Sequence, residues 1–173
     1  MKNFLLIAIA WLLACGVQAG TLTNAPACIE LPDQFEQPQK LQFPTTNITV
    51  LTLADRKGSE QIAGWVEPVA QRFGTRVAVR GIADVSAVPR LLRGMVRSGF
   101  RKEQSYPVMM DWSGGVMKQF SPKADVATVL LIDSQGRILR RFEGAAKATE
   151  IQELGAMIEK LLAPTETKMA AKP

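Results

Sequence analysis

The feature that most constrains the fold is the alternation of β-rich runs with amphipathic helical segments from residue 48 onward. The β-rich runs lie at 48–53, 76–84, 106–112, 127–133 and 138–144. Helical patterns lie at 60–73, 86–100 and 147–162, with a shorter one at 116–120. Such alternation predicts an α/β fold, and the late pair of strands makes part of the sheet antiparallel. We therefore expect a mixed sheet flanked by helices, with a C-terminal β-hairpin and helix.

The first 19 residues have the pattern of a signal peptide. They hold one lysine and an apolar run at 4–14, which is too short for a confident membrane span. Small residues at Val17 and Ala19 predict cleavage after Ala19. The alternative is a lipobox at 12–15, in which a lipidated Cys15 would anchor the chain to a membrane. Either reading predicts export, so we expect a periplasmic protein or, alternatively, a membrane-anchored lipoprotein.

The remaining chain is long enough for one domain with a real core. Residues 20–47 contain four prolines, which favours an extended N-terminal arm with a short strand near 41–43. Residues 48–162 carry the periodic patterns and form the predicted domain. Residues 163–173 are small and polar, and we expect a disordered tail.

Composition excludes several kinds of chemistry. The chain has no histidine and two cysteines, of which Cys28 alone remains after signal removal. No cofactor and no metal site is therefore expected, and neither a Ser-His-Asp nor a Cys-His site can form. Loss of Lys2 with the signal lowers the formal charge from +5 to +4, a mild basicity that does not predict nucleic-acid binding.

The predicted order of elements, together with two stretches of sequence, resembles a known family. "YPVMMDWSGGVMKQF" followed by "TVLLIDSQGRILRRFEG" resembles the thioredoxin-like superfamily, especially its peroxiredoxin and periplasmic TlpA-type branches. Asp133, Gly136, Ile138 and Gly144 recur at the family's spacing. The hairpin and final helix are also similar to those of cysteine-poor periplasmic proteins of the YtfJ type. The resemblance covers roughly 31–162 and implies a thioredoxin-like fold.

The chain departs from this family at the reactive positions. The peroxiredoxin cysteine would fall near Ile62, and a dithiol pair would fall at Glu60 and Ala63. No cysteine follows Cys28, and the family's common cis-proline corresponds to about Ala127. The sequence therefore predicts a redox-inactive variant. It leaves the isomer of Pro107 open.

The turn at the expected reactive position is the first candidate recognition surface. Arg56 and Lys57 could present charge there, and Ser59 is predicted to cap a helix beginning at Glu60. A solvated turn is the plainer alternative. The proposed surface combines this turn with a second one after the 106–112 strand; its members are Asp55, Arg56, Lys57, Ser59, Glu60, Asp111 and Trp112. Its expected partner is an unidentified envelope protein or peptide, so we expect a binding or accessory module and not an enzyme.

Three further features leave alternatives open. Cys28 is expected to be incidental or buried, but it could serve a single-cysteine peroxidase or reductase, or an intermolecular disulfide. Trp65 is expected in the core. Arginines at positions 90, 93, 97 and 101 would share one helix face. For these arginines we favour a solvated face over contact with anionic lipid or an acidic partner. Membrane attachment is expected only through a lipidated Cys15.

Overall fold

The computed structural model describes residues 23–163, so the predicted signal peptide, Cys15 and all but the first residue of the predicted tail lie outside the described residues. A five-stranded sheet with the order β5-β4-β3-β6-β7 forms the centre. Its strands are β3 (Ile48–Ala54), β4 (Val77–Asp84), β5 (Met109–Asp111), β6 (Thr128–Ile132) and β7 (Ile138–Glu143). The first three run parallel, whereas β6 is antiparallel to β3 and to β7. The predicted mixed sheet is confirmed.

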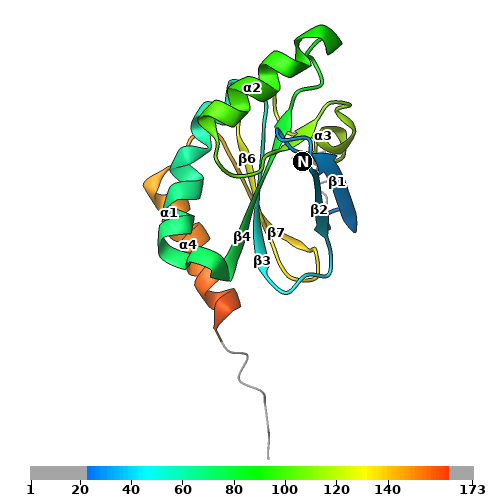
Figure 1. Ribbon diagram of the computed structural model, residues 1–173. Helices are drawn as coiled ribbons and strands as arrows, with labels where there is room; N and C mark the ends of the chain where they lie inside the picture. Colours follow the sequence, from blue (N-terminus) through cyan, green and yellow to red (C-terminus); the bar gives the residue numbers. More distant parts are fainter. Residues whose placement is uncertain (1–22, 164–173) are drawn as a thin grey trace, which may run out of the picture.

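The two faces of the sheet are covered by different elements (Figure 1). Three helices cover one face: α1 (Ala63–Phe73), α2 (Arg93–Glu103) and α4 (Ala148–Leu162). On the same side, Trp65 is fully buried, as predicted, and packs against Phe142. The opposite face is covered by the short helix α3 (Gly115–Phe120) and by the N-terminal segment. The side chains of β3 alternate between these two layers, which fixes its register within the core.

The N-terminal segment is a β-hairpin and not the extended arm that its prolines suggest. Strands β1 (Cys28–Pro32) and β2 (Pro38–Gln42) pair antiparallel. Ile29 and Leu41 lie opposite each other and are buried, together with Phe43. Pro32 and Pro38 stand at strand ends, where a missing N–H costs little, and Pro26 and Pro44 lie outside the two strands. The hairpin therefore belongs to the core of the domain.

A buried aspartate organises the turn of each hairpin. Asp33 accepts hydrogen bonds from the backbone N–H groups two and four residues further on, at 2.7 and 2.9 Å. Asp133 does the same in the β6–β7 turn, at 2.9 Å in both cases. The third residue after each aspartate has a positive φ: 64° at Glu36 and 86° at Gly136. The two turns thus share one backbone design with different residues.

The structure gives the isomer of Pro107, which the sequence left open, and the position of Pro68. Among residues 23–163 the cis peptide bond is Phe43–Pro44, so Tyr106–Pro107 is trans. Pro68 lies inside α1.

Candidate functional site

The turn that precedes α1 is held by its own aspartate. One carboxylate oxygen of Asp55 accepts the Gly58 N–H at 2.8 Å, and the other accepts the Asp125 N–H at 2.6 Å. Lys57 donates to the Asp125 carboxylate at 2.9 Å on the exposed side of the turn. This hydrogen bond and the attraction of the carboxylate raise the pKa of Lys57. Asp55 and Lys57 therefore serve to join the turn to the segment before β6.

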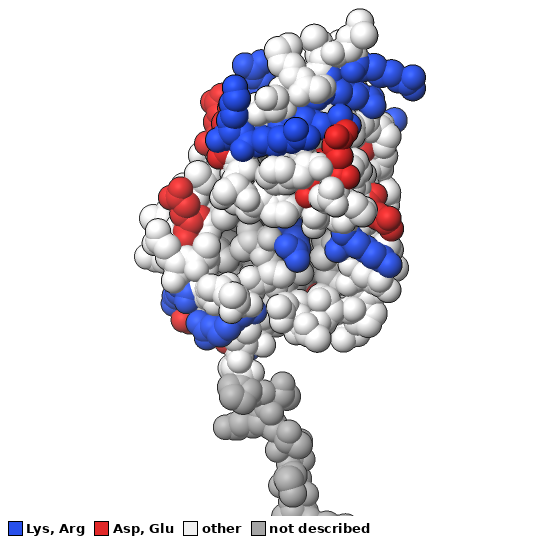
Figure 2. Space-filling model, in the orientation of Figure 1, with Lys and Arg blue, Asp and Glu red and all other residues white. Residues whose placement is uncertain are grey.

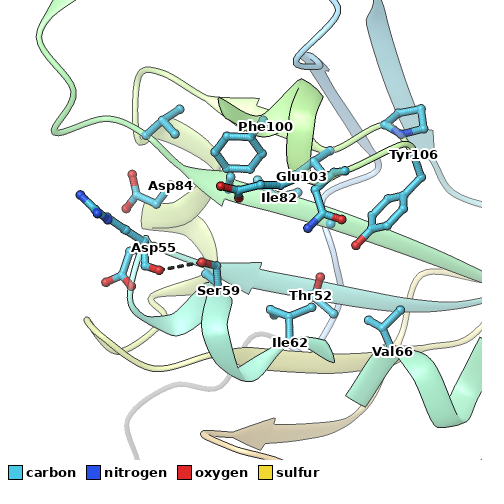
Figure 3. Close-up of a pocket in the computed structure, with 18 of the residues that line it drawn as sticks. Thr52, Asp55, Ser59, Ile62, Val66, Ile82, Asp84, Phe100, Glu103 and Tyr106 are labelled. Atoms are coloured by element: carbon cyan, nitrogen blue, oxygen red, sulfur yellow. Dashed lines mark hydrogen bonds between the residues drawn. The ribbon is translucent and has the colours of Figure 1, made fainter. Parts of the chain in front are cut away.

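Ser59 does not cap a helix, which corrects the prediction. Its hydroxyl donates to the Arg56 carbonyl at 2.6 Å, as the dashed line in Figure 3 shows. A 3-10 turn covers Gly58–Gln61, and α1 begins only at Ala63. The carboxylate of Asp55 instead accepts the N–H of Gly58, the first residue of the 3-10 turn.

Gly58 lies directly against the backbone of Val126 and Ala127. A Cβ at this position would stand 2.8 Å from the Val126 carbonyl carbon and 3.0 Å from the Ala127 nitrogen. The Ala127 N–H donates to the Gln61 side chain at 3.1 Å, a bond that proline cannot make. The turn and the 126–127 backbone are thus packed together with no room for a side chain at position 58.

A groove of about 860 Å³ opens beside this turn, between α1 and α2. Its floor is the C-terminal part of β3 and β4, where the residues are small. These floor residues are Thr52, Ala54, Gly81 and Ala83. Small side chains on the floor leave the space between the two helices unfilled.

The walls of the groove are mainly apolar (Figure 3). Ile62 and Val66 stand on the α1 side, and Phe100 and Tyr106 face them from the other side. Burial raises the pKa of the Tyr106 hydroxyl, whose residue is nevertheless 50% exposed. Ser59, Arg56 and the carboxylates of Asp55, Asp84 and Glu103 supply the polar groups at the margin. Such a site suits an apolar group with a few polar contacts at its ends.

A second hollow of about 600 Å³ adjoins the first. Leu92 of the 3-10 turn η3 (Arg90–Leu92) and Met95 of α2 line it together with Arg56 and Lys57. Arg56 lines both hollows and is exposed, so it is the member of the predicted surface best placed to meet a ligand. Glu60 is also exposed and lines the first groove.

Asp111 lies away from any recognition surface, which corrects the second half of the prediction. Its side chain is fully buried and accepts the N–H groups of Ser113, Val116 and Met117. Burial acts to raise the pKa of this carboxyl, but the hydrogen bonds from Met117, Ser113 and Val116 hold the pKa below its usual range. Asp111 therefore fixes the start of α3, since its carboxylate satisfies the first N–H groups of that helix.

Trp112 is half-buried beneath two arginines of α2. The Arg93 and Arg97 guanidinium carbons lie 4.9 and 5.3 Å from the centre of its ring. Neither Asp111 nor Trp112 lines either hollow. The turn at 55–60 thus borders the two hollows, and the turn at 111–115 does not.

Cys28 is exposed, so of the two expectations, an incidental or a buried thiol, the buried one is wrong. It begins β1 and pairs with Gln42 on the side of the sheet opposite α1. Among residues 23–163, no three acidic or cysteine side chains are arranged to hold a metal ion. None of the helices in this range is long and apolar enough to cross a membrane.

Comparison with solved structures identifies the fold. The chain is similar to the exposed lipoprotein thioredoxin Etrx1 of Streptococcus pneumoniae, with a TM-score of 0.61, 16% identity and coverage of 78% of this chain and 100% of that one. It is also similar to the peroxidoxin BcpB of Mycobacterium tuberculosis (0.57, 20% identity, 80% and 95% coverage). A DsbF homologue from Corynebacterium diphtheriae gives 0.60 at 19% identity, with 79% and 86% coverage.

These similarities confirm the thioredoxin-like fold that the sequence resemblance implied. No family model matches the chain, and no curated protein matches it. At this level of identity the likeness defines the class of fold, and the chemistry must be argued from the residues of this chain.

Proposed function

We propose that this protein is an exported, redox-inactive member of the thioredoxin-like class that binds a peptide or protein segment in the groove between α1 and α2. The observation that carries the proposal is an open apolar groove beside a turn that has no cysteine. We place the protein in the bacterial cell envelope, in the periplasm, because its N-terminal sequence has the pattern of a signal peptide.

The packing of the turn argues against a thiol role at this place. Gly58 is closed against the 126–127 backbone, and Asp55 uses both carboxylate oxygens to hold the turn. A disulfide exchange site needs an accessible thiolate and room for an attacking sulfur. This turn has no cysteine, and Glu60, Ile62 and Ala63 stand at the positions where the reactive thiols were expected, so binding is the function that we propose for it.

The groove has the properties of a site for an extended apolar segment. Its walls are formed by Ile62, Val66 and Phe100, and Tyr106 places a hydroxyl at the margin. Burial of apolar ligand surface against these walls would contribute about 25 cal/mol per Å² before the costs of association. Polar groups at the margin would set the direction and register of the bound chain.

The alternative of a single-cysteine peroxidase or reductase would need a separate site. Cys28 lies on the hairpin that covers the opposite face of the sheet from α1. Peroxide consumption by the wild type and by Cys28→Ser tests that alternative directly. We expect equal, negligible rates; a rate that depends on the thiol would contradict a purely binding role.

Site-specific photocrosslinking in intact cells tests the binding proposal. Tyr106 is the position of choice, because a benzoylphenylalanine there replaces one exposed aromatic ring with another on the groove wall. Phe35 is the matched control: it is 40% exposed and lies outside both hollows. We expect a discrete adduct from position 106 and none from position 35. The same adducts from both positions, or diffuse capture, would refute recognition in the groove.

A further inference from the structure

The η3–α2 segment is anchored at one end and projects at the other. Near its C-terminal end, Arg101 donates to the Gln34 backbone carbonyl at 2.7 Å. Arg97 forms an ion pair with Glu36 at 2.9 Å, and Arg101 approaches the same carboxylate at 3.9 Å. These contacts tie α2 to the turn of the N-terminal hairpin. They involve two of the four arginines that the sequence suggested for a solvated face, and Arg93 and Arg97 also cover Trp112.

The opposite end of this segment presents apolar side chains to solvent. Leu91 is 97% exposed, Met95 is 66% exposed and Leu92 is 43% exposed. Leu91 belongs to the 3-10 turn η3 (Arg90–Leu92) that leads into α2, and Met95 follows four residues later. We call these three residues the α2 tip. Exposing such large aliphatic groups together is costly in water unless they are covered in use.

Cationic side chains lie beside the α2 tip and along α2. Figure 2 shows Lys and Arg gathered over this end of the molecule, bordering uncharged surface. Arg90 precedes Leu91, and Arg56 shares the second hollow with Leu92 and Met95; Lys102 lies three turns further along α2, at its anchored end. Among the described residues, none of these three cations takes part in an ion pair.

The acidic groups near the tip are fewer and mostly engaged. Asp84 accepts hydrogen bonds from Ser86, and Asp125 pairs with Lys57. Glu103 ends α2 at the edge of the first groove. The projecting end therefore combines exposed aliphatic side chains with an excess of unpaired positive charge.

We propose that the α2 tip docks on the surface of an anionic lipid bilayer. Leu91 and Met95 would enter the boundary between headgroups and acyl chains, and the surrounding cations would lie among anionic headgroups. Each cation near such a surface contributes about 1 kcal/mol, which is about fivefold in binding. Neither contribution suffices alone, so binding requires the apolar tip and the cations together.

The shape and composition of the tip favour a bilayer over a protein partner. The tip is aliphatic and projects from the molecule, and it carries no aromatic residue. Protein interfaces usually depend on Trp, Tyr and Arg seated in complementary pockets, and leucine is under-represented among their energetic centres. A bilayer accepts a projecting aliphatic group without a complementary pocket.

This proposal goes beyond the proposed function and does not depend on it. Membrane contact here comes from the folded domain, in addition to any lipid attached at Cys15. The test uses the chain from Gly20 to Pro173, which includes every described residue and excludes Cys15. A lipid anchor therefore cannot contribute to the result.

Co-sedimentation with vesicles measures the proposed binding. We expect the protein to bind vesicles containing phosphatidylglycerol at low ionic strength and to bind pure phosphatidylcholine vesicles much more weakly. Leu91→Ser combined with Met95→Ser should lower the partition coefficient roughly tenfold. Arg90→Glu combined with Arg56→Glu should lower it about tenfold or more. Both pairs are exposed or largely exposed, so the fold should be retained, which circular dichroism can verify.

Lys40→Glu combined with Lys160→Glu is the matched control. It makes the same change of net charge at exposed positions on β2 and α4. We expect it to retain most of the binding. Equal loss in the control, full binding by Leu91→Ser with Met95→Ser, or no binding of the wild type to anionic vesicles would overturn the proposal. Capture of a protein that needs the tip, without vesicle binding, would point to a protein interface and would equally overturn it.

Discussion

The two hairpin turns of this protein have the same backbone and different sequences. In "PDQFEQ" and "IDSQGR", an aspartate is followed three residues later by a residue with positive φ. That residue is Glu36 in the first turn and Gly136 in the second. Glycine adopts this conformation at little cost, whereas glutamate must be held there. The comparison shows that the second turn carries its own conformational signal in Gly136, whereas the first depends more on its tertiary contacts.

The help at the first turn comes from α2. The Glu36 carboxylate forms ion pairs with Arg97 and Arg101. Two residues earlier, the Gln34 carbonyl accepts the Arg101 N–H. The Gln34 side chain is buried, donating to the Tyr106 carbonyl and accepting the Val108 N–H. The turn therefore positions the segment that forms one wall of the groove and carries the α2 tip. Among residues 23–163, no hydrogen bond or ion pair joins the second turn to a helix; its carbonyls at Ser134 and Gly136 accept the N–H groups of Thr45 and Ala25.

The largest effect is expected from removing the aspartate of either turn. Asp133→Ala leaves two backbone N–H groups without their acceptor and also removes the bond from the Arg137 side chain at 2.6 Å. Asp33→Ala removes the equivalent acceptor in the first turn. Each should lower the free energy of unfolding by about 2 to 4 kcal/mol, measured by denaturant titration. A cost below about 1 kcal/mol in either turn would break the proposed equivalence.

A smaller loss is expected from a side chain at Gly136. Its φ of 86° disfavours any L-residue, and a Cβ there would lie 3.0 Å from the Phe43 side chain. Gly136→Ala should therefore cost about 1 to 3 kcal/mol in thermal or denaturant unfolding. Gly99→Ala is the control, because a Cβ in that helix meets nothing within 4 Å. The control should be neutral or stabilising, since alanine favours helix.

The pH dependence of stability gives a further comparison. Burial acts to raise the pKa of Asp133, but hydrogen bonds from the Arg137 N–H, the Arg137 side chain and Gln135 hold the pKa below its usual range. A carboxyl with a depressed folded-state pKa contributes stability above its unfolded-state pKa, and the contribution is lost as pH falls through the folded-state pKa. We expect Asp133→Asn to reduce the loss of stability in acid, with a smaller effect than Asp133→Ala at neutral pH. An unchanged acid slope would contradict this assignment.

The same comparison explains what could be predicted from the sequence. Asp133 and Gly136 belong to a recognisable hairpin signal, so β6, β7 and their turn were predicted, as was the order of elements from residue 48 onward. The first hairpin has alternating apolar residues at Ile29, Leu31 and Leu41, but Glu36 replaces the expected glycine and prolines flank the strands. Local signals therefore favoured an arm, and burial against the sheet decided otherwise.

The candidate site was less predictable, because it depends on the separation of two helices. The turn at 55–60 could be found from its position after a strand, and Arg56 does line the groove. Nothing in the sequence marks Gly81 and Ala83 as floor residues of a groove, because small residues are ordinary within a strand. Their role depends on the unfilled space above them, which only the structure shows. Asp111 looked like a surface residue because its burial arises from the fold of α3 around it.

The smallest effect is expected at Glu36, and it tests why a glutamate stands there. Glu36→Gly relieves the strain of the positive φ. It also raises the conformational entropy of the unfolded chain, which lowers stability, and it removes the ion pairs with Arg97 and Arg101. These pairs are partly exposed and so contribute little. The terms oppose one another, and we expect a net change within about 1 kcal/mol in denaturant unfolding. Glu36→Gln keeps the Cβ and the strain while removing the charge, so it isolates the ion pairs. If Glu36 serves to hold α2, both variants should speed hydrogen exchange in α2 while global stability stays nearly constant. A loss as large as that of Gly136→Ala would show instead that Glu36 stabilises the turn itself.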